Sequence, residues 1–91
     1  MKKLKGTTVT YLAFMEENKI VKIGKTKDFE SRKSQLNTAN PYIKSYYVIP
    51  FDVEHLLHCN FYKNRVKGEW FIYQNKNVFL DKIKCILNNL L

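Results

Sequence analysis

The chain has 91 residues and carries 16 Lys and Arg against 8 Asp and Glu, which gives a formal net charge of +8 and an isoelectric point near 9.6. A chain this short builds a single domain, residues 1–91, and excludes a two-domain enzyme. Hydrophobic residues make up 45% and aromatic residues 14% of the chain, with three Gly and two Pro, which excludes a disordered tail.

The composition also predicts where the protein acts. No apolar run approaches the ~20 residues of a membrane-spanning helix, and the basic start over residues 1–5 lacks the apolar stretch of a signal peptide. We therefore expect a soluble, intracellular protein that does not use a membrane. The net charge favours a polyanion as partner, although a lysine-rich genome would give the same composition. Cys59 and Cys85 lie in apolar helical patterns, which is typical of reduced, buried thiols and not of a disulfide.

The first half of the chain predicts a hairpin followed by a helix. Residues 7–15 are rich in β-branched and aromatic side chains, and residues 20–23 form a second short apolar run after a polar turn. Gly24 is expected to end the second strand. Asp28 stands where an N-cap belongs, ahead of a helix over about residues 28–38.

The second half predicts a strand over residues 42–50, a helix over about residues 52–64 capped by Asp52, and a short aromatic strand over residues 69–73. Asn77 is expected to cap a last helix, whose predicted apolar face consists of Val78, Leu80, Ile83, Ile86, Leu87 and Leu90. This order of elements predicts an α+β fold, with a small, mostly antiparallel sheet flanked by helices.

Few acidic residues remain for chemistry once those in caps and turns are set aside, and Glu54 and Glu69 are the best candidates. Glu54 and His58 are four residues apart on one flank of the second predicted helix, so they could face a groove or simply solvent. His55 and Cys59 have the same spacing, but two ligands do not make a zinc site, because zinc needs three or four.

The chain contains four separated motifs in one order. They are Val9-Thr10-Tyr11, Val21-Lys22-Ile23-Gly24-Lys25-Thr26 with the helix residue Arg32, Glu54-His55-Leu56-Leu57-His58, and Gly68-Glu69-Trp70-Phe71. Together they resemble the GIY-YIG nuclease superfamily. The similarity is narrower to its variant branch in phages, large DNA viruses and some bacterial and fungal proteins, and it covers about residues 8–73.

The resemblance implies a metal-dependent endonuclease that acts on DNA with Mg²⁺ or Mn²⁺. Tyr11 then orients or deprotonates the attacking water, Arg32 contacts the scissile phosphate, and Glu54 holds the metal. His58 is a further catalytic candidate, for proton transfer or a phosphate contact. A lone carboxylate suits a single Mg²⁺ that keeps several waters.

The chain departs from the superfamily pattern at two places. Val9-Thr10 replace Gly-Ile in the first motif, and Lys22 stands where the second motif has its Tyr. Lys22 could polarise the water or stabilise the leaving oxygen. Equally, it could mark a domain that grips DNA without cutting it.

Residues 19–33 form the most basic stretch, and we expect this stretch to face phosphates. Its candidate nucleic-acid-binding residues are Lys19, Lys25, Lys27 and Lys33. Two alternatives to an endonuclease stay open, a non-catalytic nucleic-acid-binding module on the same fold and a host-directed protein-interaction factor. So small a domain would need a homodimer or a larger partner to read a DNA sequence. The compartment, cytoplasmic or nuclear, would depend on the host.

Overall fold

A five-stranded antiparallel sheet forms the centre of the computed structural model, which describes residues 7–90. The basic segment over residues 1–5 therefore lies outside the described residues. The strands are β1 (Val9–Met15), β2 (Ile20–Thr26), β3 (Ser45–Ile49), β4 (Arg65–Lys67) and β5 (Trp70–Ile72), and their order across the sheet is β3-β1-β2-β5-β4. The helices are α1 (Phe29–Ala39), α2 (Glu54–Asn60) and α3 (Lys76–Asn88), and a 3₁₀ turn covers Tyr62–Asn64.

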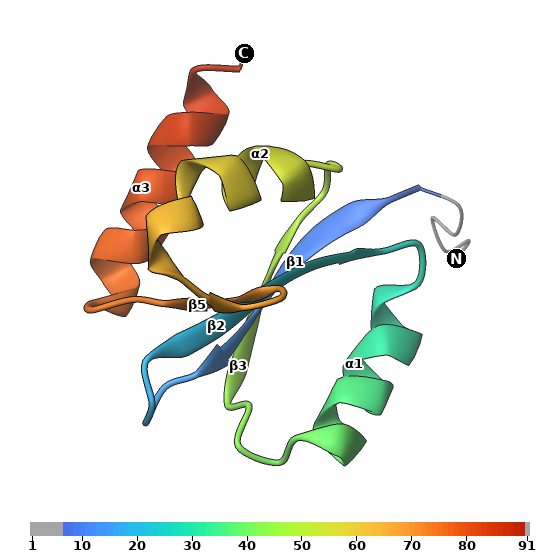
Figure 1. The fold of residues 1–91 in the computed structure, drawn as a ribbon. Coiled ribbons are helices and arrows are strands. Elements are labelled where there is room, and N and C mark those ends of the chain that lie inside the picture. The colour runs from blue at the N-terminus through green and yellow to red at the C-terminus, as the bar shows by residue number, and fades with distance from the viewer. Residues whose placement is uncertain (1–6, 91) are drawn as a thin grey trace.

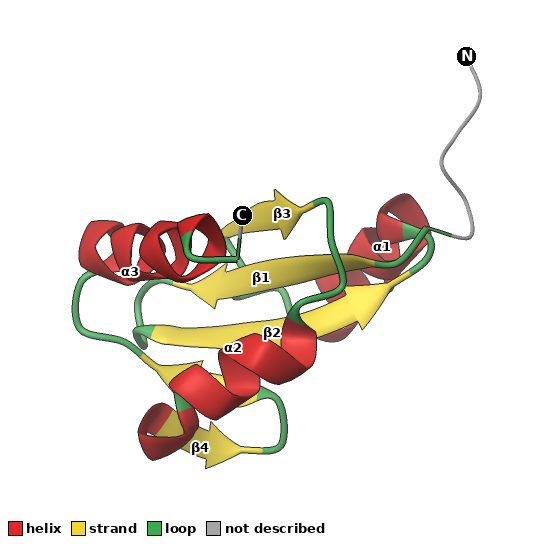
Figure 2. Cartoon of the chain, turned by 90° about the horizontal axis from the view of Figure 1, so that it is seen from above, coloured by secondary structure: helices red, strands yellow, loops and turns green. Residues whose placement is uncertain are grey.

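The helices cover the two faces of the sheet unequally. α1 lies on one face, and α2 and α3 lie on the other (Figure 1). In the second view α2 crosses over β2 (Figure 2). Alternate residues of β1 divide the core accordingly: Leu12 and Phe14 belong to the cluster beneath α2 and α3, whereas Tyr11 and Ala13 belong to a smaller cluster with Phe29 of α1. This arrangement confirms the predicted α+β class.

The predictions that depend on residues close together in the sequence are confirmed. The hairpin forms, and Asp28 caps α1 by accepting a hydrogen bond from Ser31 N at 3.2 Å. Gly24, however, does not end the second strand, because β2 continues to Thr26. None of the helices within residues 7–90 is long and apolar enough to cross a membrane.

Several predictions about the second half are wrong. α2 begins at Glu54 without an Asp52 cap, because Val53 N donates to the Thr10 hydroxyl instead. The helix ends at Asn60, before the predicted end near residue 64. Asn75, not Asn77, caps α3 by accepting from Val78 N. β4, a three-residue strand whose side chains are all exposed, was not predicted.

The predicted burial of several side chains is also wrong. Cys59 and Cys85 are free and exposed, because both lie off the buried stripe of their helices. Val78 and Leu90 are 61% and 56% exposed, and the buried side chains of α3 are Phe79 and Ile83.

Candidate active site

One end of β2 has no strand beside it on the side of β5. β5 pairs with Ile20–Lys22 only, and the last backbone bond of this ladder runs from Ile23 N to Glu69 O at 2.9 Å. The chain then departs through Gly68, whose φ of +56° is left-handed. The segment from Gly24 to Thr26 is therefore an open edge, where groups from both faces of the sheet can meet.

Tyr11 reaches this edge across Gly24, its partner in the β1–β2 pair. A Cβ atom at Gly24 would lie 2.5 Å from the Tyr11 hydroxyl oxygen and 2.6 Å from its Cζ, so only glycine leaves room for the ring. Tyr11 is fully buried, and its ring packs 6.1 Å from that of Phe29. Its hydroxyl is the one buried side-chain polar atom within residues 7–90 that makes no hydrogen bond.

Arg32 lies near that hydroxyl because Asp28 starts α1 one turn earlier, where its carbonyl accepts from Arg32 N at 3.0 Å. Burial raises the pKa of Tyr11, and the Arg32 guanidinium opposes part of this effect. No hydrogen bond of ordinary geometry joins the two side chains. The phenol is therefore protonated at neutral pH and has hydrogen-bonding capacity to spare.

Glu54 approaches from the other face of the sheet, at the first turn of α2. Thr10, fully buried in β1, holds the chain just before it: the Thr10 hydroxyl donates to Phe51 O at 2.7 Å and accepts from Val53 N at 2.8 Å. This tertiary contact replaces a local helix cap and ties the start of α2 to the strand that carries Tyr11. Glu54 is close enough to Tyr11 to raise the pKa of the phenol.

Glu69, the other acidic residue that the sequence offers for chemistry, completes the cluster. Burial raises the pKa of Glu54 first, and the neighbouring Glu69 carboxyl raises it further. Glu69 also forms an ion pair with Lys22 at 3.5 Å, and the Lys22 ammonium lies 5.5 Å from the centre of the Trp70 ring. Two carboxyl groups thus share a small space beside an unpartnered hydroxyl.

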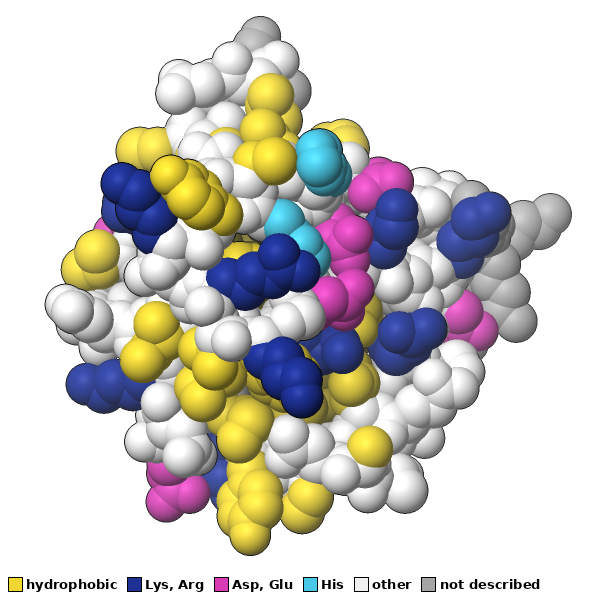
Figure 3. Space-filling model, in the orientation of Figure 1, with side chains coloured by type: hydrophobic (Ala, Val, Ile, Leu, Met, Phe, Trp, Pro, Cys, Tyr) yellow, Lys and Arg dark blue, Asp and Glu magenta, His cyan; other side chains and the backbone are white. Residues whose placement is uncertain are grey.

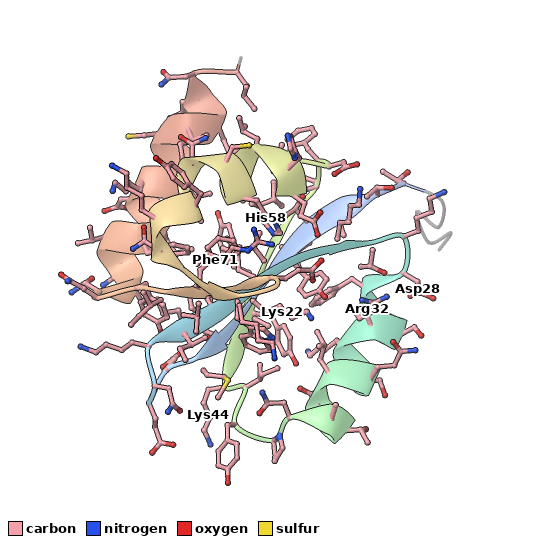
Figure 4. The ribbon with its side chains drawn as sticks, viewed as in Figure 1. Lys22, Asp28, Arg32, Lys44, His58 and Phe71 are labelled. Carbon is pink, nitrogen blue, oxygen red and sulfur yellow. The ribbon has the colours of Figure 1, made fainter. Side chains whose placement is uncertain are left out.

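His58 has a hydrogen bond that sequence reasoning could not foresee. Its Nε2 donates to the carbonyl of Ile23 at 2.9 Å, where a longer β5 would have supplied a backbone N–H. The ring also contacts Phe71, with 5.0 Å between centroids. This bond occupies one ring nitrogen, so proton transfer by His58 stays a prediction that would have to use Nδ1. Figure 4 shows His58 beneath α2, and Lys22 and Arg32 on the α1 side.

The sequence of the chain matches the model of a known domain family. The T5orf172 domain matches residues 8–88, a range that includes every residue of the site. The chain belongs to the T5orf172 domain family. T5orf172 is a phage-associated domain, and the family is associated with nuclease-like proteins. No curated protein and no solved structure matches the chain significantly.

The predicted phosphate-binding lysines of this T5orf172 domain do not form one surface. Lys27 is exposed just after β2, and Lys25 lies at the open edge in an ion pair with Asp52 at 3.8 Å. Lys33 of α1 lies over the ring of Tyr46 in β3, with 5.6 Å from its ammonium to the ring centre. Lys19 is at the opposite end of β2, about 20 Å from Lys25 at the usual rise of a strand. DNA binding by these residues stays a prediction.

The face that carries the site has a mixed charge. Acidic side chains form a row beside a histidine, and Lys and Arg side chains lie on both sides of the row (Figure 3). A polyanion could contact the flanking cations while one of its phosphates faces the acidic row.

Proposed function

We propose that this T5orf172 domain is a metal-dependent endonuclease of the GIY-YIG superfamily that hydrolyses phosphodiester bonds in DNA. The observation that carries the proposal is that the Tyr11 hydroxyl lies across Gly24 at the open edge, with Arg32 from one face of the sheet and Glu54 from the other near enough to shift its pKa. The family's association with nuclease-like proteins and the net charge of +8 support the same function.

The donor set suits one hard cation, Mg²⁺ or Mn²⁺. Within the described residues no three His, Cys, Asp or Glu side chains gather as a metal centre, so the protein's share would come from Glu54, with Glu69 adjacent. The Glu54 carboxyl, whose pKa is raised by burial and by the neighbouring Glu69, would gain from a cation beside it. Mg²⁺ commonly keeps several waters and takes further oxygens from substrate phosphates. Such a cation supplies Lewis-acid stabilisation of charge on the phosphate oxygens.

The other side chains have separable roles in this proposal. Arg32 offers a planar fork of donors to the phosphate oxygens as negative charge builds on them. Because burial raises the pKa of Tyr11, its hydroxyl serves as a hydrogen-bond partner that orients the attacking water, and not as the base in the free protein. Lys22 is placed to neutralise Glu69 in the absence of substrate and to approach a phosphate when that ion pair opens.

A non-catalytic DNA-binding module is the second candidate, and the ion pair between Lys22 and Glu69 favours it. In that case Lys22 permanently neutralises one of the two carboxylates, and the remaining cations hold the DNA backbone.

Cleavage of supercoiled plasmid by wild type, Glu54→Gln and Glu30→Gln separates the two candidates. Glu30 lies in the first turn of α1, so its variant makes the same charge change at another helix start. We expect Mg²⁺- or Mn²⁺-dependent nicking by wild type and Glu30→Gln and none by Glu54→Gln. Without metal, Glu54→Gln should bind DNA as well as wild type or slightly better, because it removes a negative charge.

An Arg32→Ala variant should lose some DNA binding and, as for one oxyanion donor, on the order of 100-fold in rate. If wild type binds DNA but cleaves no single-stranded, duplex or branched substrate with Mg²⁺, Mn²⁺, Co²⁺ or Ni²⁺, the enzyme proposal is wrong and the binding module stands. If wild type does not bind DNA, both candidates are wrong.

A further inference from the structure

A groove lies at the far end of β5, beyond the active site. Two adjoining cavities of about 270 and 460 Å³ share Asn64, Ile72, Tyr73 and Gln74. Asn18 and Lys19 line one end, and Lys82 of α3 lines the other. We call this the amide groove, because three of its side chains carry free amides.

The lining of the amide groove combines three kinds of contact. The side-chain amides of Asn18, Asn64 and Gln74 are exposed and make no hydrogen bond with any residue from 7 to 90. Ile72 is 48% exposed and gives the groove an apolar surface. No Asp or Glu lines either cavity, and a lysine lies at each end. The groove therefore suits an anion that also has hydrogen-bonding edges and an apolar face.

Lys19 occupies its place at a conformational cost. Its φ of +55° is in the left-handed region, which glycine and asparagine adopt more easily than lysine. The backbone is held there because Tyr73 N donates to Lys19 O at 2.9 Å. The turn would be less strained with glycine at this position, so the lysine stands there against the local preference. Such strain is typical of positions where a side chain has a function.

We propose that the amide groove binds an unpaired nucleotide, with the base over Ile72 and its phosphates near Lys19 and Lys82. Amide side chains donate and accept side by side, which matches the edges of nucleobases. The cavities fall within the size range of small-molecule sites, about 300–1,000 Å³, when taken together. This inference rests on the proposed function, because it takes the nucleotide to belong to the DNA that is cut.

The spacing of groove and active site defines the substrate. Lys19 and Lys25 are separated by the length of β2, about 20 Å at ~3.3 Å per residue. Successive base pairs of duplex DNA are about 3.4 Å apart, so this distance corresponds to roughly six base pairs. The proposal therefore predicts that duplex DNA with an unpaired nucleotide about six base pairs from the phosphate at the active site is preferred over fully paired duplex DNA.

Binding without metal tests the groove independently of cleavage. Fluorescence anisotropy in EDTA would compare a 12-base-pair duplex with the same duplex carrying a three-nucleotide overhang. We expect the overhang to raise affinity about three- to tenfold, as for one or two added hydrogen bonds. Lys82→Ala and Gln74→Ala should abolish this gain. Lys84→Ala, on another side of α3 with the same charge change, and Gln35→Ala on α1 should keep it.

Two further measurements identify the ligand and the role of Lys19. A mononucleotide, dAMP, titrated against ¹⁵N-labelled protein should shift the side-chain amide signals of Asn64 and Gln74. The overhang duplex should shift them at lower concentration if the nucleotide comes from a strand, and only dAMP should do so if it comes from the free pool. Lys19→Gly should be more stable than wild type, because it relieves the strained φ, yet should lose the overhang gain.

The proposal is overturned if neither ligand shifts the amide signals, if the overhang adds no affinity, or if Lys84→Ala loses as much as Lys82→Ala. If the amide groove binds no nucleotide, Glu54-dependent cleavage should still be observed. If the proposed nuclease function is wrong, the protein should still prefer the overhang duplex in binding but should cleave no DNA. Glu54→Gln should retain the overhang preference whether or not wild type cleaves DNA.

Discussion

Replacement of Gly24 by alanine tests the close approach that carries Tyr11 to the open edge of the sheet. The added Cβ would lie 2.5 Å from the Tyr11 hydroxyl oxygen and 2.6 Å from Cζ, and the ring is fully buried, so it cannot simply swing away. Overpacking of this kind costs about 1–3 kcal/mol of unfolding free energy. Without the clash, the same change inside a strand stabilises by roughly 0.5–1 kcal/mol, because glycine loses more freedom on folding.

A double-mutant cycle with Tyr11→Leu separates these effects, because leucine is too short to cross Gly24. We expect Gly24→Ala to destabilise wild type but to be neutral or stabilising in the Tyr11→Leu background, a coupling of about 1.5–4 kcal/mol. Urea unfolding measures all four proteins. Gly68→Ala is the control: its φ of +56° makes alanine strained, but nothing lies within 4 Å, so its cost should be equal in both backgrounds. Equal costs for Gly24→Ala in the two backgrounds would refute the reasoning.

Three further predictions concern other parts of the structure. Thr10→Val should destabilise by about 1–3 kcal/mol in urea unfolding, because it leaves buried backbone groups at the start of α2 unpaired, whereas Thr10→Ser should recover most of the loss. Hydrogen bonding from Lys76 lowers the pKa of Glu16, so its contribution to stability is present above the unfolded pKa, about 4.3, and is lost as pH falls through the folded value. Wild type should therefore lose more stability than Glu16→Gln between pH 7 and pH 3, and parallel curves would contradict this. Replacing Lys25 and Lys27 by Ala should reduce the slope of log affinity for DNA against log salt by about two, and an unchanged slope would remove both lysines from the interface.

The sequence allowed correct prediction of the elements whose signals are local. The hairpin strands carry β-branched and aromatic side chains, and Asp28 caps α1 through a hydrogen bond from Ser31, only three residues on. The start of α2 was predicted wrongly because its deciding hydrogen bond comes from Thr10, 43 residues earlier in the chain. No local rule distinguishes Asp52 as a cap from Asp52 as a surface partner of Lys25. β4 was missed for a related reason: its side chains are all exposed, and pairing with β5 alone defines it.

The same distinction explains which site residues could be found. Tyr11, Arg32 and Glu54 stand in motifs, and the structure brings them close enough for Arg32 and Glu54 to shift the pKa of the phenol. Lys19 is in the same basic stretch as Lys25, yet a straight strand puts them at opposite ends of the sheet, so one linear patch becomes two separate surfaces.

Glu69 shows most clearly what sequence reasoning lacks. Its position depends on where β5 stops pairing with β2, and nothing within Gly68-Glu69-Trp70 specifies that register. If β5 were two residues longer, its backbone N–H would donate to the Ile23 carbonyl, and the hydrogen bond from His58 would be unnecessary. The edge beside Gly24 would then be covered, and the Tyr11 hydroxyl would face a strand. The short β5 is therefore the feature that leaves groups from both faces of the sheet free to meet at this edge, and its length follows from pairing, not from the residues of the motif.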